Sequence, residues 1–263
     1  MTSFNLFTAV SWIITGFVSA ILSVLFLSKN PKRRLNQLFA TGFIFWSFSM
    51  LLNGINFAIA YTSLTAANVF RDLSVIFGVF SAIILFIAAI GIYFGADTVN
   101  WILILIFVAV AATLAGFGAA NDWVTQDGLG GFKTTDNLLG KICVQIITAV
   151  FVITADVFLF LTYRSSKNPK AKKRVGFFVI GYSTIIIGLL MYVFDTFINI
   201  SPYVFPSLAQ IAWVMGPILM LIGFYVKADE IDIPSLPKDG FLKNESQLLK
   251  HEQEQTLEKP SLE

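Results

Sequence analysis

Long runs of apolar residues alternate with short polar segments along the chain as far as residue 226. A helix that crosses the roughly 30 Å hydrocarbon core of a bilayer needs about 20 apolar residues. Seven runs reach this length with almost no charge in their middle portions, and none has the two-residue alternation of a membrane β-barrel strand. The pattern predicts an all-α, polytopic membrane protein, a seven-helix bundle with spans at Thr8–Leu27, Leu38–Ala60, Val69–Gly95, Trp101–Ala120, Ile142–Tyr163, Val175–Ile198 and Val204–Val226.

The composition agrees with that pattern and narrows the chemistry. Hydrophobic residues make up 56% of the chain and charged residues 13%, about half the charged fraction of a typical soluble domain. The single cysteine, Cys143, excludes an intrachain disulfide, and the single histidine, His251, lies beyond the last apolar run. Phosphate-binding loops, zinc motifs and nucleophile elbows are absent from the sequence. We therefore expect a protein that is not an enzyme and has no cofactor, no metal and no nucleic-acid partner.

Lysine and arginine indicate the orientation, because they are enriched in cytoplasmic loops. With seven spans, one side of the bundle carries eleven of them and the other carries Arg71, Lys133 and Lys141. The pattern predicts a multi-pass protein of the cell membrane with its N-terminus outside and its C-terminus in the cytoplasm. The basic residues of the inner side are Lys29, Lys32, Arg33, Arg34, Arg164, Lys167, Lys170, Lys172, Lys173, Arg174 and Lys227.

Two domains follow from this division. Residues 1–227 form the predicted transmembrane domain, and residues 228–263 form a polar, charged cytoplasmic tail that has too few apolar residues to build a core. The longest outer connection, residues 121–141, contains Gly128, Gly130 and Gly131 and is expected to turn repeatedly.

Polar residues within the spans gather toward the predicted outer half. Such residues are costly in a bilayer and need partners or water. One interpretation is an outward-facing pocket for a small ligand, with Asp195 close enough to pair with Arg71. The other is solvation at the interface together with hydrogen bonds between helices. The candidate ligand-binding residues are Asn53, Asn56, Arg71, Asp72, Gln145, Asp195, Gln210 and Trp213.

Two further residues stand apart from this group. Asp156 lies in the inner half of the fifth span and is either part of a proton or ion relay or a single carboxyl group satisfied by its neighbours. Pro217 lies inside the seventh span after Gly216 and predicts a kink, which is either a hinge or a packing feature.

A short internal similarity links the two basic loops. Ser28-Lys29-Asn30-Pro31-Lys32 recurs as Ser166-Lys167-Asn168-Pro169-Lys170, each time between two predicted helices. This similarity fits a parallel repeat of three helices on either side of a linker helix. It equally fits two independent inner loops, which favour lysine and proline in any case.

The first basic loop also resembles part of a known family. The segment Asn30-Pro31-Lys32-Arg33-Arg34-Leu35-Asn36-Gln37-Leu38-Phe39, followed by Trp46, is similar to the first inner loop and second helix of the seven-helix N-terminal sensor region of histidine kinases. The resemblance implies a seven-helix bundle that passes a signal inward. It covers the membrane part only, because the residues after the last span hold neither a phosphoacceptor box nor an ATP-binding domain.

The leading hypothesis is a non-enzymatic, receptor-like membrane sensor that signals to a separate cytoplasmic partner. Its basic residues Lys29, Lys32, Arg33, Arg34, Lys170, Lys172, Lys173 and Arg174 would contact that partner or anionic membrane lipids. The alternative is a small secondary transporter with a three-one-three helix layout. A structural subunit without a ligand is a third interpretation. The sequence does not identify the small ligand.

Overall fold

The computed structural model describes residues 3–128, 130–167, 169–198 and 204–225, with the side chains of residues 3, 4, 170, 171, 174 and 195–198 left aside. The predicted tail, residues 228–263, lies outside the described residues.

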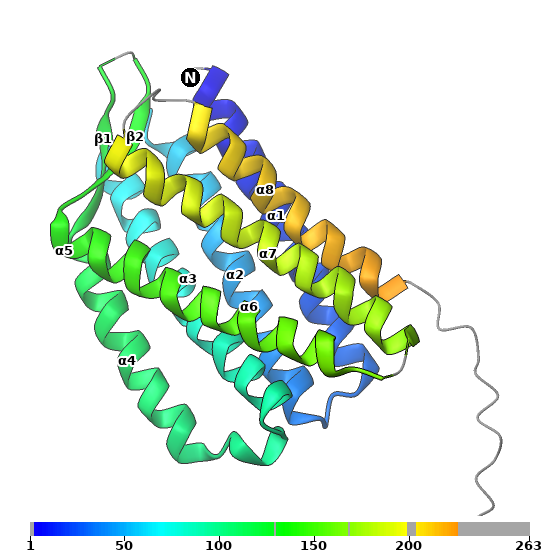
Figure 1. Cartoon of the computed structure of the whole chain (residues 1–263). Helices are drawn as coiled ribbons and strands as arrows, with labels where there is room; N and C mark the ends of the chain where they lie inside the picture. The colour runs from blue at the N-terminus through cyan, green and yellow to red at the C-terminus, as the bar shows by residue number, and fades with distance from the viewer. Residues whose placement is uncertain (1–2, 129, 168, 199–203, 226–263) are drawn as a thin grey trace, which may run out of the picture. The chain divides into compact units, whose positions relative to one another are not determined.

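The described chain is almost entirely helical and contains seven helices that are long and apolar enough to cross a membrane (Figure 1). They coincide closely with the seven predicted spans. The fifth is composite, because α5, the π-helical segment η2 and α6 run on as one stretch, Leu138–Ser165. The helices are α1 (Ser3–Lys29), α2 (Arg34–Ile59), α3 (Leu64–Tyr93), the short η1 (Ala96–Thr98), α4 (Trp101–Ala119), α5 (Leu138–Gly140), η2 (Lys141–Ile147), α6 (Thr148–Ser165), α7 (Pro169–Ile198) and α8 (Val204–Tyr225).

Several helix starts are set by polar side chains that accept from the otherwise unpaired N–H groups of the first turn. The Ser63 hydroxyl accepts from the backbone N–H of Ala66 at the start of α3. Asn100 accepts from Leu103 at the start of α4, and Asn137 accepts from Gly140 at the start of α5. These polar residues therefore separate apolar runs that would otherwise be hard to delimit.

Six of the seven membrane-spanning helices form a closed ring, and the remaining one, α4, packs outside it. Each of α1, α2, α3, α6, α7 and α8 packs against the next, and α8 returns to α1. Helix α4 packs against α3 outside this ring. Its outer surface bears large apolar side chains, among them Trp101 and Leu105, which are 68% and 60% exposed. Such a surface suits contact with lipid rather than water.

The predicted irregular connection at residues 121–141 is in fact an ordered β-hairpin followed by the start of α5. Strands β1 (Asp122–Gln126) and β2 (Phe132–Asp136) pair antiparallel, with Asp122 opposite Asp136. Gly128 and Gly130 have positive φ in the turn, which glycine adopts without strain. The hairpin lies where α1 and α8 begin (Figure 1), and we call this the hairpin end of the bundle.

Polar side chains of two helices attach the hairpin to the bundle. The amide of Asn5 in α1 is buried; it donates to the carbonyl of Phe132 at 2.8 Å and accepts from the N–H of Phe132 at 3.1 Å. Asn68 of α3 accepts from the N–H of Val124 at 2.7 Å. Each strand is therefore held through its backbone, so the hairpin is a fixed cover over that end of the ring.

Helices α7 and α8 approach each other closely because glycines face the partner backbone. A methyl group on Gly181 would lie 2.5 Å from the carbonyl oxygen of Gly216, and one on Gly188 would lie 2.6 Å from the Trp213 ring. Small residues at helix contacts are typical of membrane bundles. Pro217 directly follows this contact in α8.

Candidate functional site

The ring encloses a cavity of about 150 Å³ that runs from the hairpin to just beyond the middle of the bundle. Its wall includes residues from Arg71 to Leu85 of α3, about 21 Å along a helix axis. All six helices of the ring contribute, as does Thr134 of β2. We call this the hairpin-end cavity.

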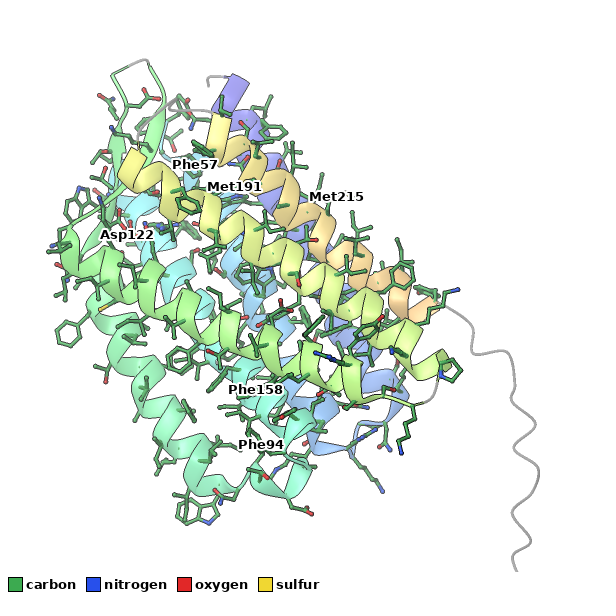
Figure 2. All side chains as sticks on the ribbon, viewed as in Figure 1. Phe57, Phe94, Asp122, Phe158, Met191 and Met215 are labelled. Atoms are coloured by element: carbon green, nitrogen blue, oxygen red, sulfur yellow. The ribbon has the colours of Figure 1, made fainter. Side chains whose placement is uncertain are left out.

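Arg71 is the centre of the polar network at the mouth of this cavity. Its Nε and Nη2 both lie 2.6 Å from Oδ2 of Asp122, and its Nη1 donates to Oδ1 of Asn53 at 2.7 Å. Asn53 Oδ1 also accepts from the amide of Asn56 at 3.2 Å. The ion pair joins α3 to β1, so the hairpin is tied to the bundle by charge as well as by backbone hydrogen bonds. Figure 2 shows Asp122 at this end of the molecule.

A second carboxylate extends the network to the fifth span. Gln145 of η2 donates to Oδ2 of Asp136 at 2.8 Å. Burial raises the pKa of Asp136, and the charge of Asp122 raises it further, while Arg71 and Lys141 oppose the shift. Burial likewise raises the pKa of Asp122, against the opposing charge of Arg71. Burial thus raises the pKa of both carboxyl groups, and the positive charge of Arg71 opposes both shifts.

The serines of the cavity wall are occupied by bonds between helices. Ser49 donates to the carbonyl of Ser74, and Ser74 donates to that of Ser49, both at 2.9 Å. Ser81 donates to the carbonyl of Gly42 at 2.8 Å. These hydroxyl groups fasten α2 to α3.

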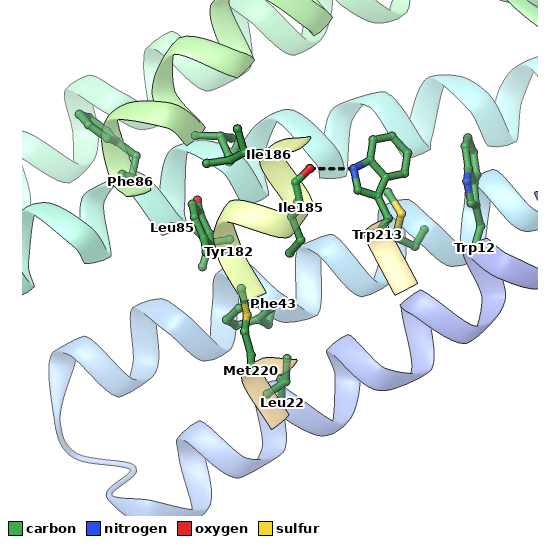
Figure 3. Close-up of a cluster of buried hydrophobic side chains, with 14 of the residues drawn as sticks. Trp12, Leu22, Phe43, Leu85, Phe86, Tyr182, Ile185, Ile186, Trp213 and Met220 are labelled. Carbon is green, nitrogen blue, oxygen red and sulfur yellow. Dashed lines mark hydrogen bonds between the residues drawn. The ribbon is translucent and has the colours of Figure 1, made fainter. Parts of the chain in front are cut away.

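Aromatic side chains from four helices form the opposite wall. Trp213 of α8 stacks on Tyr192 of α7 at 4.9 Å between ring centroids. Trp12 of α1 and Trp46 of α2 flank Trp213 at 6.1 and 6.0 Å. The Trp213 indole donates to the carbonyl of Ile185 at 3.1 Å (Figure 3), so its own polar group is used within the protein.

Three buried polar atoms of the cavity wall have no partner among the described residues. They are the indole nitrogens of Trp12 and Trp46 and the phenol oxygen of Tyr182. Trp12 and Tyr182 are only 4% and 2% exposed. The sequence analysis missed all three, because an aromatic residue in an apolar helix gives no indication of whether it faces a cavity, the packed core or lipid.

The structure brings together four of the eight predicted site residues. Asn53, Arg71, Gln145 and Trp213 line the cavity. The remaining four do not line it, and they differ in where they lie.

Two of those four support the wall from behind. Asn56 is fully buried behind Asn53, and Gln210 is fully buried between three helices, where its amide donates to Thr8 at 3.0 Å and to Tyr192 at 3.4 Å. Asp72 is half-buried beside Arg71. The side chain of Asp195 lies outside the described residues. The ion-pair partner of Arg71 is Asp122, which the sequence analysis did not consider.

A second cavity of about 330 Å³ lies at the opposite end of the bundle, where the loop between α1 and α2 is located; we call this the basic-loop end. Its wall is apolar and rich in phenylalanine, and Lys29, Arg33 and Asn36 stand at its rim. The ammonium group of Lys29 lies 4.5 Å from the centre of the Phe224 ring.

A phenylalanine layer separates the two cavities. Phe43 lines the hairpin-end cavity, whereas Phe39 and Phe178 line the other. Phe178 meets Phe43 edge to face at 6.1 Å and Phe39 at 5.5 Å. Phe43 and Tyr182 belong to one buried cluster with Leu22 and Met220 (Figure 3).

Asp156, the predicted relay residue, lines neither of these two cavities. Its Oδ2 accepts from the hydroxyl of Ser183 at 2.7 Å, which joins α6 to α7, and its Oδ1 has no partner among the described residues. The relay therefore stays a prediction, and the visible role of Asp156 is a contact between helices.

The predicted lipid- or partner-contacting residues differ in their surroundings. Lys32, Arg33 and Lys173 are exposed, and the side chains of Lys170 and Arg174 lie outside the described set. Arg34 donates to the carbonyl of Val99, and Lys172 lies 5.2 Å from the centre of the Tyr163 ring.

Comparison with known proteins identifies no family for the chain: the sequence matches no protein-family model and has no significant similarity to a curated protein. The segment that resembles the kinase sensor region has a local structural role. Asn36 donates to the carbonyl of Asn30, Gln37 donates to that of Pro31, and Asn30 accepts from the N–H of Lys32. The motif thus closes the loop between α1 and α2, a task that many membrane proteins share.

Proposed function

We propose that the protein is a receptor-like membrane sensor, with the hairpin end outside the cell and a ligand site in the hairpin-end cavity. The observation that carries this proposal is the cavity itself, which all six ring helices line and whose lining residues include three with a buried polar atom that has no partner in the described part of the chain. A buried polar group without a partner costs roughly 1–3 kcal/mol, so a bound molecule that satisfied it would stabilise the bundle.

The same cavity provides a route to the basic-loop end. Tyr182 and Tyr192 on α7 and Trp213 on α8 line it, and both helices continue to the phenylalanine layer and the second cavity. Since α7 and α8 meet backbone to backbone at Gly181 and Gly216, they would move together. A ligand that shifts α7 would therefore alter the basic loops, where a separate cytoplasmic partner would dock and anionic lipids would gather.

A thermal-shift screen of small molecules, on protein in lipid nanodiscs, tests the site. The screen compares wild type with Thr148→Phe, which places a ring in the cavity. Thr154→Phe is the matched control, because Thr154 lies on the same helix outside the cavity wall and, like Thr148, donates only to a preceding carbonyl of its own helix.

The proposal predicts compounds that stabilise wild type and Thr154→Phe but not Thr148→Phe. A screen without such compounds, or one whose hits bind Thr148→Phe equally well, would contradict it.

The two cavities also favour a second candidate, the small transporter. They lie at opposite ends of the ring with one aromatic layer between them, as alternating access requires. Uptake of a screened compound into proteoliposomes, lost in Thr148→Phe and kept in Thr154→Phe, would favour the transporter. Binding without uptake would favour the sensor.

A further inference from the structure

We infer that the hairpin-end cavity takes a flat, uncharged ring compound that carries carbonyl or ether oxygens as hydrogen-bond acceptors. This inference rests on the proposed ligand site and names the chemical class of its ligand. It is carried by the buried donors of Trp12, Trp46 and Tyr182, which have no hydrogen-bond partner among the residues that the structure describes.

Most other polar side chains of the wall are already engaged. Arg71 is bound to Asp122 and Asn53, Gln145 to Asp136, and Trp213 to Ile185. The serines donate to backbone carbonyls across α2 and α3. The polar atoms that remain include two indole N–H groups, which only donate, and one phenol, which donates or accepts. A ligand that satisfies them must therefore bring acceptor atoms.

The charges of the wall argue against an ionic ligand. No acidic residue is among the described residues that line the cavity, so a cation finds no counter-charge among them. The one cationic residue in that described lining, Arg71, is paired at 2.6 Å with Asp122, so an anion would have to compete with a buried carboxylate. A neutral molecule avoids both penalties.

The size and shape of the cavity indicate a single ring. A cavity of about 150 Å³ is comparable to one that binds benzene in an engineered protein. Trp12 and Trp46 each lie about 6 Å from Trp213, and Tyr182 lies one helical turn from Ile185, whose carbonyl holds Trp213. Two of the donors therefore flank the Trp213 ring, against which we expect a flat ring to stack while its oxygens accept from the donor edges.

1,3-Benzodioxole and indane form a matched pair of probes, because both are flat fused rings small enough for a cavity of about 150 Å³ and only benzodioxole has ether oxygens. Binding to the protein in nanodiscs is measured by equilibrium dialysis, with partition into empty nanodiscs subtracted. We expect benzodioxole to bind about tenfold more tightly than indane, since two net hydrogen bonds supply that factor. The carboxylate benzoate and the cation benzylammonium should bind no more tightly than indane.

Three variants remove one donor each and keep an aromatic ring: Trp12→Phe, Trp46→Phe and Tyr182→Phe. Each should weaken the binding of benzodioxole by about threefold to tenfold and change the binding of indane by less than about twofold. The indane result reports whether the cavity is intact, so misfolding and donor loss are distinguishable. Trp101→Phe, on the exposed surface of α4, is the control and should change neither.

Ultraviolet resonance Raman spectra provide an independent readout, because indole vibrations respond to hydrogen bonding at the N–H group. Benzodioxole should shift the bands of Trp12 and Trp46, identified by their loss in the two Phe variants, and indane should not.

Equal affinity for benzodioxole and indane, or benzodioxole binding that is unchanged in all three donor variants, would overturn the ligand class. Preference for the carboxylate or the cation would overturn the class and leave the proposed sensor standing. Binding of benzodioxole as expected, without any structural response at the basic-loop end, would support the class and count against the sensor.

Discussion

The two cavities lie in the same ring of helices and differ in almost every chemical respect. The hairpin-end cavity has indole, phenol, amide and guanidinium groups, with its charges paired across α3 and the hairpin. The basic-loop-end cavity is walled by phenylalanine and has cations only at its rim. If the proposed ligand site is correct, we expect the first to orient a polar ligand and the second to accept apolar groups without orienting them. Figure 2 shows Asp122 at the hairpin end and Phe94 and Phe158, edge to face at 5.4 Å, at the opposite end.

This difference indicates at which end of the bundle a side-chain substitution should affect stability. Arg71 and Asp122 at the hairpin end are largely buried and paired with each other, so changing one leaves the other unsatisfied. Basic groups at the other end are exposed or rest on aromatic rings, so their exchange should have little effect on stability. The following predictions test that difference, starting with the largest effect.

Arg71→Met should have the largest effect, because it leaves the buried carboxylate of Asp122 without its cation. Removal of one partner of a buried ion pair costs about 3–5 kcal/mol. Thermal unfolding in nanodiscs should show a pronounced fall in Tm, and Arg71→Met/Asp122→Asn should recover most of it. Arg33→Met, at the exposed rim of the other cavity, should stay within about 0.5 kcal/mol of wild type. Equal losses of stability in Arg71→Met and Arg33→Met would contradict the difference between the two ends of the bundle.

Added volume on α7 should be tolerated differently along the helix. In Gly181→Ala the new methyl group meets the Gly216 backbone at 2.5 Å, which cannot yield, and should cost about 1–3 kcal/mol by overpacking. In Gly176→Ala, nearer the basic-loop end, it meets only the Tyr163 ring at 3.1 Å, which can turn aside. Denaturant titration of both variants gives the difference. A Gly181→Ala protein as stable as Gly176→Ala would contradict the close contact between α7 and α8.

Asp136→Asn should give the smallest effect and reveal the carboxyl pair through its pH dependence. Burial and Asp122 raise the folded-state pKa of Asp136 above its unfolded value of 3.8. Its contribution to stability is therefore complete below that value and is lost as pH rises through the folded pKa. At neutral pH the variant should be slightly more stable than wild type, by less than about 1 kcal/mol, and the gap should close in acid. The interaction between Asp122 and Asp136 would be contradicted if the stability difference between wild type and Asp136→Asn widened in acid. It would also be contradicted if the exposed Asp97→Asn showed the same difference.

The helices could be predicted because seven long apolar runs and a few polar caps determine them almost independently of tertiary structure. The hairpin could not, although Asp127-Gly128 between the alternating segments Asp122–Gln126 and Phe132–Asp136 was a usable indication. Its strands are only five residues each and depend on Asn5 and Asn68, which come from distant parts of the chain.

The site was predictable only in part, for a related reason. Asn53, Arg71 and Gln145 could be found because polar residues in apolar helices are conspicuous. Trp12 and Tyr182 could not, because which face of a helix borders a cavity is decided by the packing of all six ring helices. The partner of Arg71 was missed because Asp122 lies just after a span, where an acidic residue is usually solvated.

A distance measurement across the basic-loop end tests the central claim most directly. Spin labels at Lys32 and Lys167, both exposed, are introduced by cysteine substitution in a Cys143→Ser background, and the protein is reconstituted in nanodiscs. Occupation of the hairpin-end cavity by benzodioxole, or by a compound from the screen, should shift the distance distribution in this protein and not when Thr148→Phe is added. An identical distribution with and without a compound that demonstrably binds in that cavity would contradict the sensor.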